Sequence, residues 1–162
     1  MTTDCGRADV YSAEASAFDG TDLESVRPLQ QIVETIEEVI GGAWWPGGSV
    51  RVAAARSDAR SSSARRVEGH DTVIRLAADQ LTLATAAHEL AHALAGPAAG
   101  HAPVFLAAYL DVIAVITNLD TSDRRRRLHV EQLRDAFVRA DLEIGPRRWP
   151  PPPETAGGAI AL

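Results

Sequence analysis

Residues 82–105 of the chain read TLATAAHELAHALAGPAAGHAPVF. Two histidines in this stretch, His88 and His92, are four residues apart, and Glu89 stands between them. On an α-helix, side chains four residues apart point the same way, with Cβ atoms about 5–6 Å apart. The two imidazoles can therefore bind one cation. Zinc is the default metal for such nitrogen ligands, although cobalt, manganese or nickel can replace it.

Glu89 is suited to a different task. It follows His88 by one residue, so it is rotated by about 100° around the helix and is a poor further ligand to the same ion. Its carboxylate can instead accept a proton from a metal-bound water and pass that proton to a leaving group. The HExxH pattern is typical of this division of roles, and it predicts Glu89 as the general base of a zinc hydrolase.

A third metal ligand has to come from outside this helix. His101 is the best candidate, because Gly96, Pro97 and Gly100 favour a tight reversal that brings the chain back beside the metal. Asp111, Asp79 and Glu68 remain as alternatives.

The periodicity of the motif segment predicts a helix from about Thr82 to the stop at Gly96-Pro97. Its two faces differ in character. The apolar residues Leu83, Ala87, Leu90 and Leu94 share the face expected to enter the core, whereas Thr85, His88, Glu89 and His92 share the face expected to line a cleft.

Before the motif, the pattern predicts a short helix over 7–18 and a clearer one over about 22–40, capped by Asp22 and stopped by Gly41-Gly42. A strand follows at Val50 and Val52. The Ser- and Arg-rich segment 56–70 is expected to form either a hairpin with a ragged partner strand or a loop. A second strand over 73–76 would lie at the mouth of the site, where its edge could accept an extended peptide.

After the motif, the sequence predicts the most buried helix of the fold, starting at Pro103. A last helix is expected from the capping residues of 120–123 to about Ala140, burying Leu128, Leu133, Phe137 and Val138. The Pro- and Gly-rich residues 146–162 are expected to be a disordered tail or to lie over the surface. These elements predict an α+β domain over 1–145, with a small β-sheet packed on several helices that include the HExxH helix.

Composition limits the class of protein. With 162 residues, 46% hydrophobic residues and no long apolar run, the chain is expected to form one globular domain without a membrane span. The acidic start and the single cysteine, Cys5, favour the cytoplasm. A net charge of −6 argues against nucleic acid as the main partner. The arginines within 56–66 and 124–127 could contact an acidic partner, although a solvated charged surface is the simpler interpretation.

The residues His88-Glu89-Leu90-Ala91-His92, followed by Gly100-His101-Ala102-Pro103-Val104-Phe105, resemble the zincin metallopeptidases. The SprT-like group and small metallohydrolases of high-GC bacteria are particularly similar. The resemblance covers residues 82–106 and implies a minimal zincin-like fold, with His88, His92 and His101 as zinc ligands and Glu89 as the catalytic base. Ala102 stands where the SprT-like pattern usually has glycine, and no four-cysteine zinc ribbon follows.

The expected substrate is a peptide or protein, and zinc is the expected cofactor. Tyr109, His129, Arg75 and Tyr11 are candidates for stabilising an oxyanion, with Tyr109 preferred. Two alternatives stay open: a regulatory protease of the ImmA/IrrE type that cleaves a repressor, and a zinc-stabilised binding module that breaks no bond.

Overall fold

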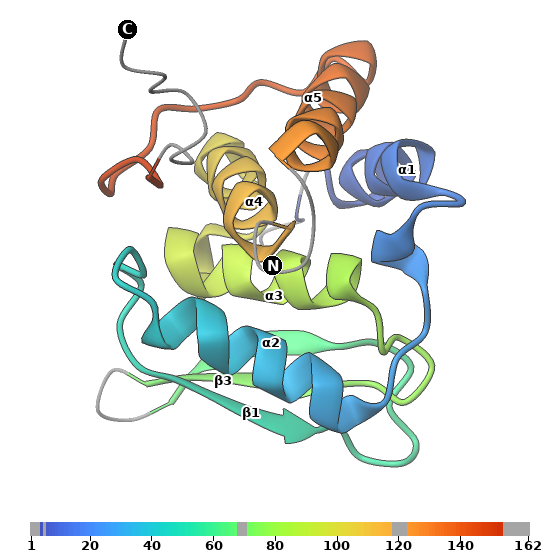
Figure 1. Ribbon diagram of the computed structural model, residues 1–162, viewed down its shortest axis with the longest axis vertical. Coiled ribbons are helices and arrows are strands. Elements are labelled where there is room, and N and C mark those ends of the chain that lie inside the picture. The colour runs from blue at the N-terminus through green and yellow to red at the C-terminus, as the bar shows by residue number, and fades with distance from the viewer. Residues whose placement is uncertain (1–3, 5, 68–70, 118–122, 154–162) are drawn as a thin grey trace, which may run out of the picture.

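The structure is a computed structural model that describes residues 4, 6–67, 71–117 and 123–153 (Figure 1). Within these residues the chain forms five α-helices and a mixed sheet of three strands, which confirms the predicted α+β class. The elements in chain order are α1 (Arg7–Phe18), a 3-10 turn η1 (Asp22–Glu24), α2 (Leu29–Gly41), β1 (Val50–Ala54), β2 (Ser63–Arg66), β3 (Thr72–Leu76), α3 (Leu83–Ala95), a 3-10 turn η2 (Pro97–Ala99), α4 (Pro103–Ile116) and α5 (Asp123–Arg139).

The sheet has the order β1-β3-β2, with β3 parallel to β1 and antiparallel to β2. Alternation along β3 buries Thr72, Ile74 and Leu76 and leaves Arg75 exposed, so one face of the sheet enters the core. The segment 56–70 therefore supplies the partner strand of a hairpin with β3. The prediction that the 73–76 strand presents a free edge is wrong, because β3 is the central strand and β2 is the edge strand.

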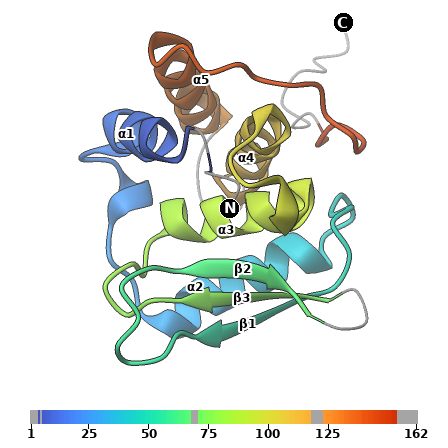
Figure 2. The ribbon, with the colours of Figure 1, turned by 180° about the vertical axis from the view of Figure 1, so that it is seen from behind.

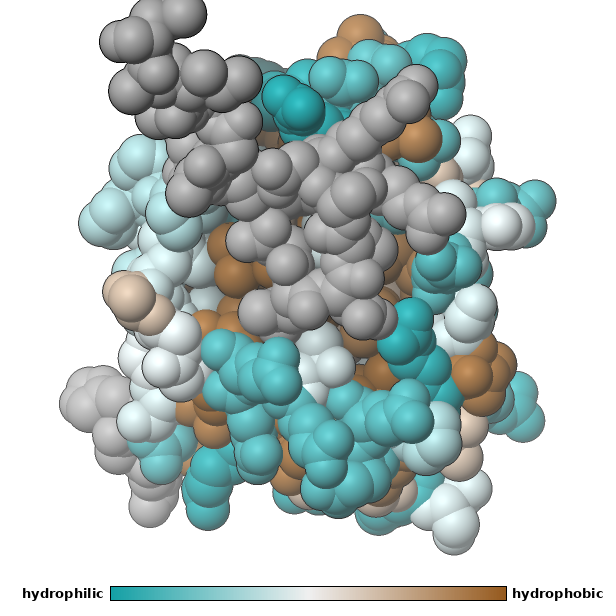
Figure 3. All heavy atoms as spheres, in the orientation of Figure 1, coloured by the Kyte–Doolittle hydropathy of each residue, from teal (hydrophilic) through white to brown (hydrophobic). Residues whose placement is uncertain are grey.

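The helices form two layers above the buried face of the sheet (Figures 1 and 2). Helices α2 and α3 lie against the strands, and α1, α4 and α5 lie on the far side of α3. The outer side of α2 carries the exposed residues Glu34, Glu37 and Glu38. In the space-filling view, the lower part of the molecule, where α2 lies, is largely hydrophilic (Figure 3). Helix α3 is thus enclosed between the sheet and the second layer of helices.

The predicted helix over 22–40 starts later than expected. Its first residues form the 3-10 turn η1, and α2 begins at Leu29 with Pro28 as the capping residue. Proline disfavours the helical conformation of the residue that precedes it, here Arg27. The backbone N–H of Arg27 instead donates a hydrogen bond of 2.8 Å to the carbonyl of Leu81. The predicted stop is confirmed, because α2 ends at Gly41.

Helices α3 and α4 match their predictions closely. Thr82 caps α3, and its hydroxyl accepts the N–H of Thr85 at 3.1 Å. In α4 every residue is buried except Pro103, Ala114 and Val115, so this apolar helix forms the centre of the fold. Between the two helices, Gly96 and Gly100 have positive φ angles of 96° and 56°. They make the predicted reversal.

Helix α5 was predicted with the right length but with a partly wrong buried face. Leu133 and Phe137 are fully buried, whereas Leu128 and Val138 are 49% and 65% exposed. Residues four apart share a helical face, so the residue that continues the Leu133–Phe137 face is His129 rather than Leu128. The predicted capping residues at 120–122 and the side chains of Arg124, Arg125 and Arg126 lie outside the described part of the chain.

The first residues of the tail are attached to the domain. Arg147 donates two hydrogen bonds of 2.9 Å to the carboxylate of Asp111, and Trp149 Nε1 donates a third at 2.8 Å. Trp44 Nε1 also donates to the carbonyl of Pro150 at 2.9 Å. Residues 146–153 therefore lie over the surface, and residues 154–162 lie outside the described part.

Among the described residues, no helix combines the length and the apolar character that crossing a membrane requires.

Candidate metal centre

Three histidines converge where α3 meets the start of α4. His88 and His92 come from successive turns of α3, and His101 comes from the reversal that precedes α4. Their candidate ligand atoms all lie within 4.8 Å of one another, and Nε2 of His88 is 3.2 Å from Nε2 of His101. The structure thus brings together the three ligands predicted from the sequence. Three imidazole nitrogens this close together form a donor set for a metal ion that prefers nitrogen ligands, as zinc does.

Carboxylates orient two of these imidazoles from behind. Nδ1 of His88 is 3.1 Å from Oε2 of Glu14, and Nδ1 of His101 is 2.6 Å from Oδ2 of Asp4. A carboxylate accepts the Nδ1 proton, which leaves the Nε2 lone pair free for a metal. Metal-binding histidines commonly have such a partner, which fixes the ring and makes it a better ligand. Both the three histidines and the carboxylates that orient two of them therefore fit a metal site.

The backbone at Gly100 makes the contact between Asp4 and His101 possible. Gly100 has a φ of 56°, and a Cβ at this position would lie 3.1 Å from Oδ1 of Asp4. The same carboxylate oxygen accepts the backbone N–H of His101 at 3.2 Å. A side chain at Gly100 would both strain the backbone and push Asp4 away from His101.

The supporting residues Glu14 and Asp4 were missed from the sequence. They lie 74 and 97 residues away from their histidine partners. The only signal was on α1, where Arg7, Tyr11 and Glu14 recur at helical spacing among few apolar residues. In the structure Glu14 is the buried member of this polar face, whereas Arg7 and Tyr11 are exposed.

Glu89 is buried beside the three histidines. Its side chain is only 4% exposed, and its Oε2 atom has no hydrogen-bond partner in the structure. Burial raises the pKa of Glu89 to about 7, an effect that His88 opposes and Glu14 reinforces. A buried carboxylate without a partner is unfavourable on its own. A metal-bound or otherwise bound group at the site could supply the missing partner of Oε2.

Burial favours the neutral form of His92 and His101, which is the form that binds a metal. Burial, together with His88 and His101, lowers the pKa of His92 to about 3. Burial also lowers the pKa of His101, although the hydrogen bond to Asp4 acts in the opposite direction. The pKa of Asp4 itself is lowered, because its hydrogen bonds with His101 outweigh the effect of burial. At neutral pH these groups need not lose a proton before they bind a cation.

The two candidate tyrosines differ in burial and in the contacts that they make. Tyr109, the preferred oxyanion stabiliser, is fully buried, and its hydroxyl donates to Oε1 of Glu14 at 2.5 Å. Tyr11 stacks on the ring of His88 with centroids 5.2 Å apart and is 39% exposed. Of these two, Tyr11 is the one that faces the open side of the site. A catalytic role for Tyr109 stays a prediction, and its contacts favour a positioning role through Glu14.

The other candidates lie elsewhere or are used otherwise. His129 is buried against Phe18, and Arg75 is on the outer face of the sheet. Asp111 is paired with Arg147, so it has no free carboxylate for a metal. Asp79 lines a cavity next to the site, and Glu68 lies outside the described residues.

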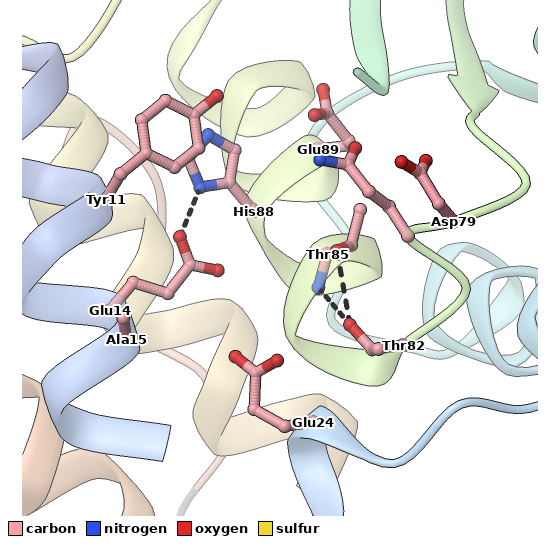
Figure 4. Close-up of a pocket in the computed structure, with 10 residues that line it drawn as sticks. Tyr11, Glu14, Ala15, Glu24, Asp79, Thr82, Thr85, His88 and Glu89 are labelled. Carbon is pink, nitrogen blue, oxygen red and sulfur yellow. Dashed lines mark hydrogen bonds and ion pairs between the residues drawn. The ribbon is translucent and has the colours of Figure 1, made fainter. Parts of the chain in front are cut away.

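Two cavities flank the site and share Tyr11 and Glu89 in their walls. The first, of about 240 Å³, is shown in Figure 4 and is lined by Tyr11, Glu14, Ala15, Glu24, Asp79, Gln80, Thr82, Thr85, His88 and Glu89. The second, of about 190 Å³, is lined by Asp4, Arg7, Tyr11, Ser62, Ser63, Ala64, Glu89, His92, Pro97, Gly100 and His101. A bound molecule could therefore reach the histidines from either side.

Comparisons of the chain with protein-family models, with curated proteins and with solved structures each found no match. The chemistry of the site has to be inferred from its own residues.

Proposed function

We propose that the protein is a zinc-dependent hydrolase, and specifically a metallopeptidase, in which Glu89 is the general base. The observation that carries this proposal is the position of Glu89, a buried carboxylate without a partner beside three convergent imidazoles. A structural zinc site usually fills its fourth position with a protein ligand, whereas a catalytic site keeps that position open for water or substrate. Three histidines with an adjacent free carboxylate match the catalytic type.

His88, His92 and His101 would hold the zinc ion, and Glu14 and Asp4 would fix the orientation of two of these ligands. When bound, zinc supplies an acidified water and polarises the substrate carbonyl. Glu89 would accept a proton from that water at Oε2 and return it to the leaving amine. Its raised pKa, about 7 without a metal, belongs to a carboxyl group that can both take up and release a proton near neutrality.

Tyr11 is our candidate for the residue that assists at the substrate oxygen. Its ring covers His88 and lies tilted against His101 with centroids 5.7 Å apart. Tyr11 lines both cavities, so its side chain would border a substrate bound in either of them. We assign it the role of hydrogen-bond donor to the developing oxyanion.

A peptide is the substrate class that the surroundings of the site favour. Residues 62–64 at the start of the edge strand β2 line the second cavity, and among the described residues no strand pairs with the outer edge of β2. An extended peptide could lie along such an edge through main-chain hydrogen bonds. Its scissile bond would then lie over the histidines, with the two cavities receiving side chains on either side of the cut.

The test combines metal content with hydrolysis. Elemental analysis of the purified protein should give roughly one zinc per chain, with a large loss in the His101→Ala variant. The zinc-loaded wild type should cleave a mixture of unfolded protein substrates, and Glu89→Gln should keep the zinc while losing at least about a hundredfold in rate. The exposed Glu38→Gln on α2 is the matched control and should behave like the wild type.

Two results would contradict the proposal. A protein that takes up no zinc when zinc is supplied would remove the metal centre. A Glu89→Gln variant that cleaves a validated substrate as fast as the wild type would remove the general base. Zinc binding without hydrolysis of any substrate, combined with unfolding on metal removal, would favour the non-catalytic binding module instead.

A further inference from the structure

We propose that the first cavity, between α1, η1 and the start of α3, is a binding site for a cationic side chain, arginine or lysine, of the substrate. This inference rests on the proposed function, because it names the class of residue that the peptidase would accept next to the cleaved bond. It goes beyond the catalytic residues, since Glu24 and Asp79 have no part in the chemistry described above.

The walls of this cavity are acidic on several sides. Figure 4 shows side chains from separate elements around it: Glu14 on α1, Glu24 on η1, Asp79 in the loop before α3, and Glu89 on α3 itself. No arginine is among the lining residues. The second cavity differs, because it includes Arg7 together with Asp4 and Glu89. The two sides of the metal centre are therefore unequal in charge, and the first side is the one that attracts a cation.

Within the described part of the chain, two of the four acids of the cavity, Glu24 and Asp79, are not paired with a basic group, whereas Glu14 contacts His88 and Tyr109. Among the described residues, neither Glu24 nor Asp79 has an ion-pair partner. The charged groups that act on Glu24 are themselves acids, Glu14 and Asp19, and together with burial they raise its pKa. Glu89, which lines this cavity as well as the second one, is buried, and its Oε2 atom has no hydrogen-bond partner. The lining of the cavity thus includes two exposed carboxylates, those of Glu24 and Asp79, and one buried carboxylate oxygen without a partner, that of Glu89.

The shape and the neutral groups of the cavity suit a long, charged side chain. The cavity has a volume of about 240 Å³, and Gln80, Thr82 and Thr85 add polar groups to its wall. An apolar side chain would remove water from the carboxylates without replacing their hydrogen bonds. A guanidinium or ammonium group could bury its aliphatic stem along Ala15 and Tyr11 and donate to the carboxylates at the rim.

The experiment measures binding and cleavage with matched peptides. Short degenerate peptides carry arginine, lysine, citrulline or glutamate at one fixed position, and citrulline keeps the shape of arginine without its charge. Fluorescence anisotropy on the zinc-loaded protein should show arginine and lysine peptides binding about tenfold or more tightly than citrulline peptides. The Glu24→Gln/Asp79→Asn double variant should lose most of this preference, whereas Glu37→Gln/Glu38→Gln, which removes two exposed charges from α2, should keep it.

Both rim residues are exposed, so the double variant is expected to fold normally, and its circular dichroism spectrum and melting temperature check this. Equal binding of arginine and citrulline peptides by the wild type would overturn the inference. So would a second zinc or calcium ion per chain that disappears in the double variant, because the cavity would then be a metal site.

The outcomes also separate this inference from the proposed function. If the protein binds arginine peptides preferentially but hydrolyses none of them, the result supports the subsite and contradicts the proposed peptidase activity. If the protein hydrolyses peptides but its cleavage sites have no basic residue at a fixed position, the result supports the peptidase activity and contradicts the subsite.

Discussion

Oε2 of Glu14 lies 3.1 Å from Nδ1 of His88, although the two residues are 74 positions apart in the sequence. The other oxygen of the same carboxylate accepts the hydroxyl of Tyr109 at 2.5 Å. Glu14 therefore links His88, a candidate metal ligand on α3, to the buried helix α4. This arrangement makes α1 part of the candidate metal centre rather than a peripheral helix.

Removing this carboxylate should weaken metal binding. We expect Glu14→Ala to lower zinc affinity by about 10–100-fold, since the orienting partner of a ligating histidine typically contributes that much. Competition with a fluorescent zinc chelator measures the affinity. Asp9→Asn, an exposed acid on the same helix, is the control. Unchanged zinc affinity in Glu14→Ala would show that the His88 contact has no role in metal binding.

The two tyrosines should separate in their effects on catalysis. Tyr11→Phe removes only the hydroxyl to which we assign the oxyanion contact, so we expect kcat to fall by about 10–100-fold with zinc content unchanged. Tyr109→Phe removes the hydrogen bond to Glu14 and should mainly reduce zinc affinity and stability. Steady-state kinetics at saturating zinc, together with chelator titration, distinguish the two. A larger loss of kcat in Tyr109→Phe at full zinc occupancy would restore Tyr109 as the oxyanion stabiliser.

In the metal-free protein, Glu89→Gln should increase stability at alkaline pH. Burial raises the pKa of Glu89 from 4.5 to about 7, so the folded state binds this proton more tightly than the unfolded state does. The wild type therefore loses stability as pH rises from about 4.5 through 7, by roughly 3 kcal/mol for this group. Glutamine has no charge to bury and avoids that loss.

Urea unfolding of the chelator-treated protein at several pH values measures this effect. The advantage of Glu89→Gln should be full at pH 8 and should disappear as pH falls to about 4.5, where both side chains are neutral. An advantage that is equal at both ends of this range would mean that the carboxyl group is not the cause.

The attachment of the tail should contribute to stability. Asp111 is buried in α4 and is paired with Arg147 and Trp149. Arg147→Ala leaves this carboxylate with one partner fewer, and we expect a loss of about 1–3 kcal/mol in the free energy of unfolding. Urea unfolding measures this loss, and Arg148→Ala, which changes the exposed neighbouring arginine, is the control. Equal stabilities for the two variants would show that Asp111 does not depend on Arg147.

The sequence predicted those parts of the site that local geometry determines. His88 and His92 are one helical turn apart, and the glycines at 96 and 100 permit the reversal that returns His101 to them. Local residues also set two helix boundaries, because Thr82 caps the start of α3 and Gly41 ends α2. The start of α2 was misplaced because the influence of Pro28 on Arg27 was overlooked, not because the signal was absent.

The remaining parts depend on contacts between distant residues. Nothing near Glu14 or Asp4 in the sequence shows which histidine each would meet, because the packing of α1 decides this. The order of the strands is a tertiary property too: β3 follows β2 in the chain but lies between β1 and β2. In α5, Leu128 and Val138 are apolar but lie off the buried face that Leu133 and Phe137 share. The polar residue His129 continues that face instead.

The position of Asp4 and Glu14 has a consequence for the order in which the protein assembles. Before α1 docks, α3 and the following reversal can offer three imidazoles but neither of the carboxylates that orient them. Docking closes chain segments of 74 and 97 residues, and zinc binding would offset part of the entropy lost in that closure. Metal occupancy and the docking of α1 would then form one coupled equilibrium. A partner that drew α1 away from the domain would release the metal as well.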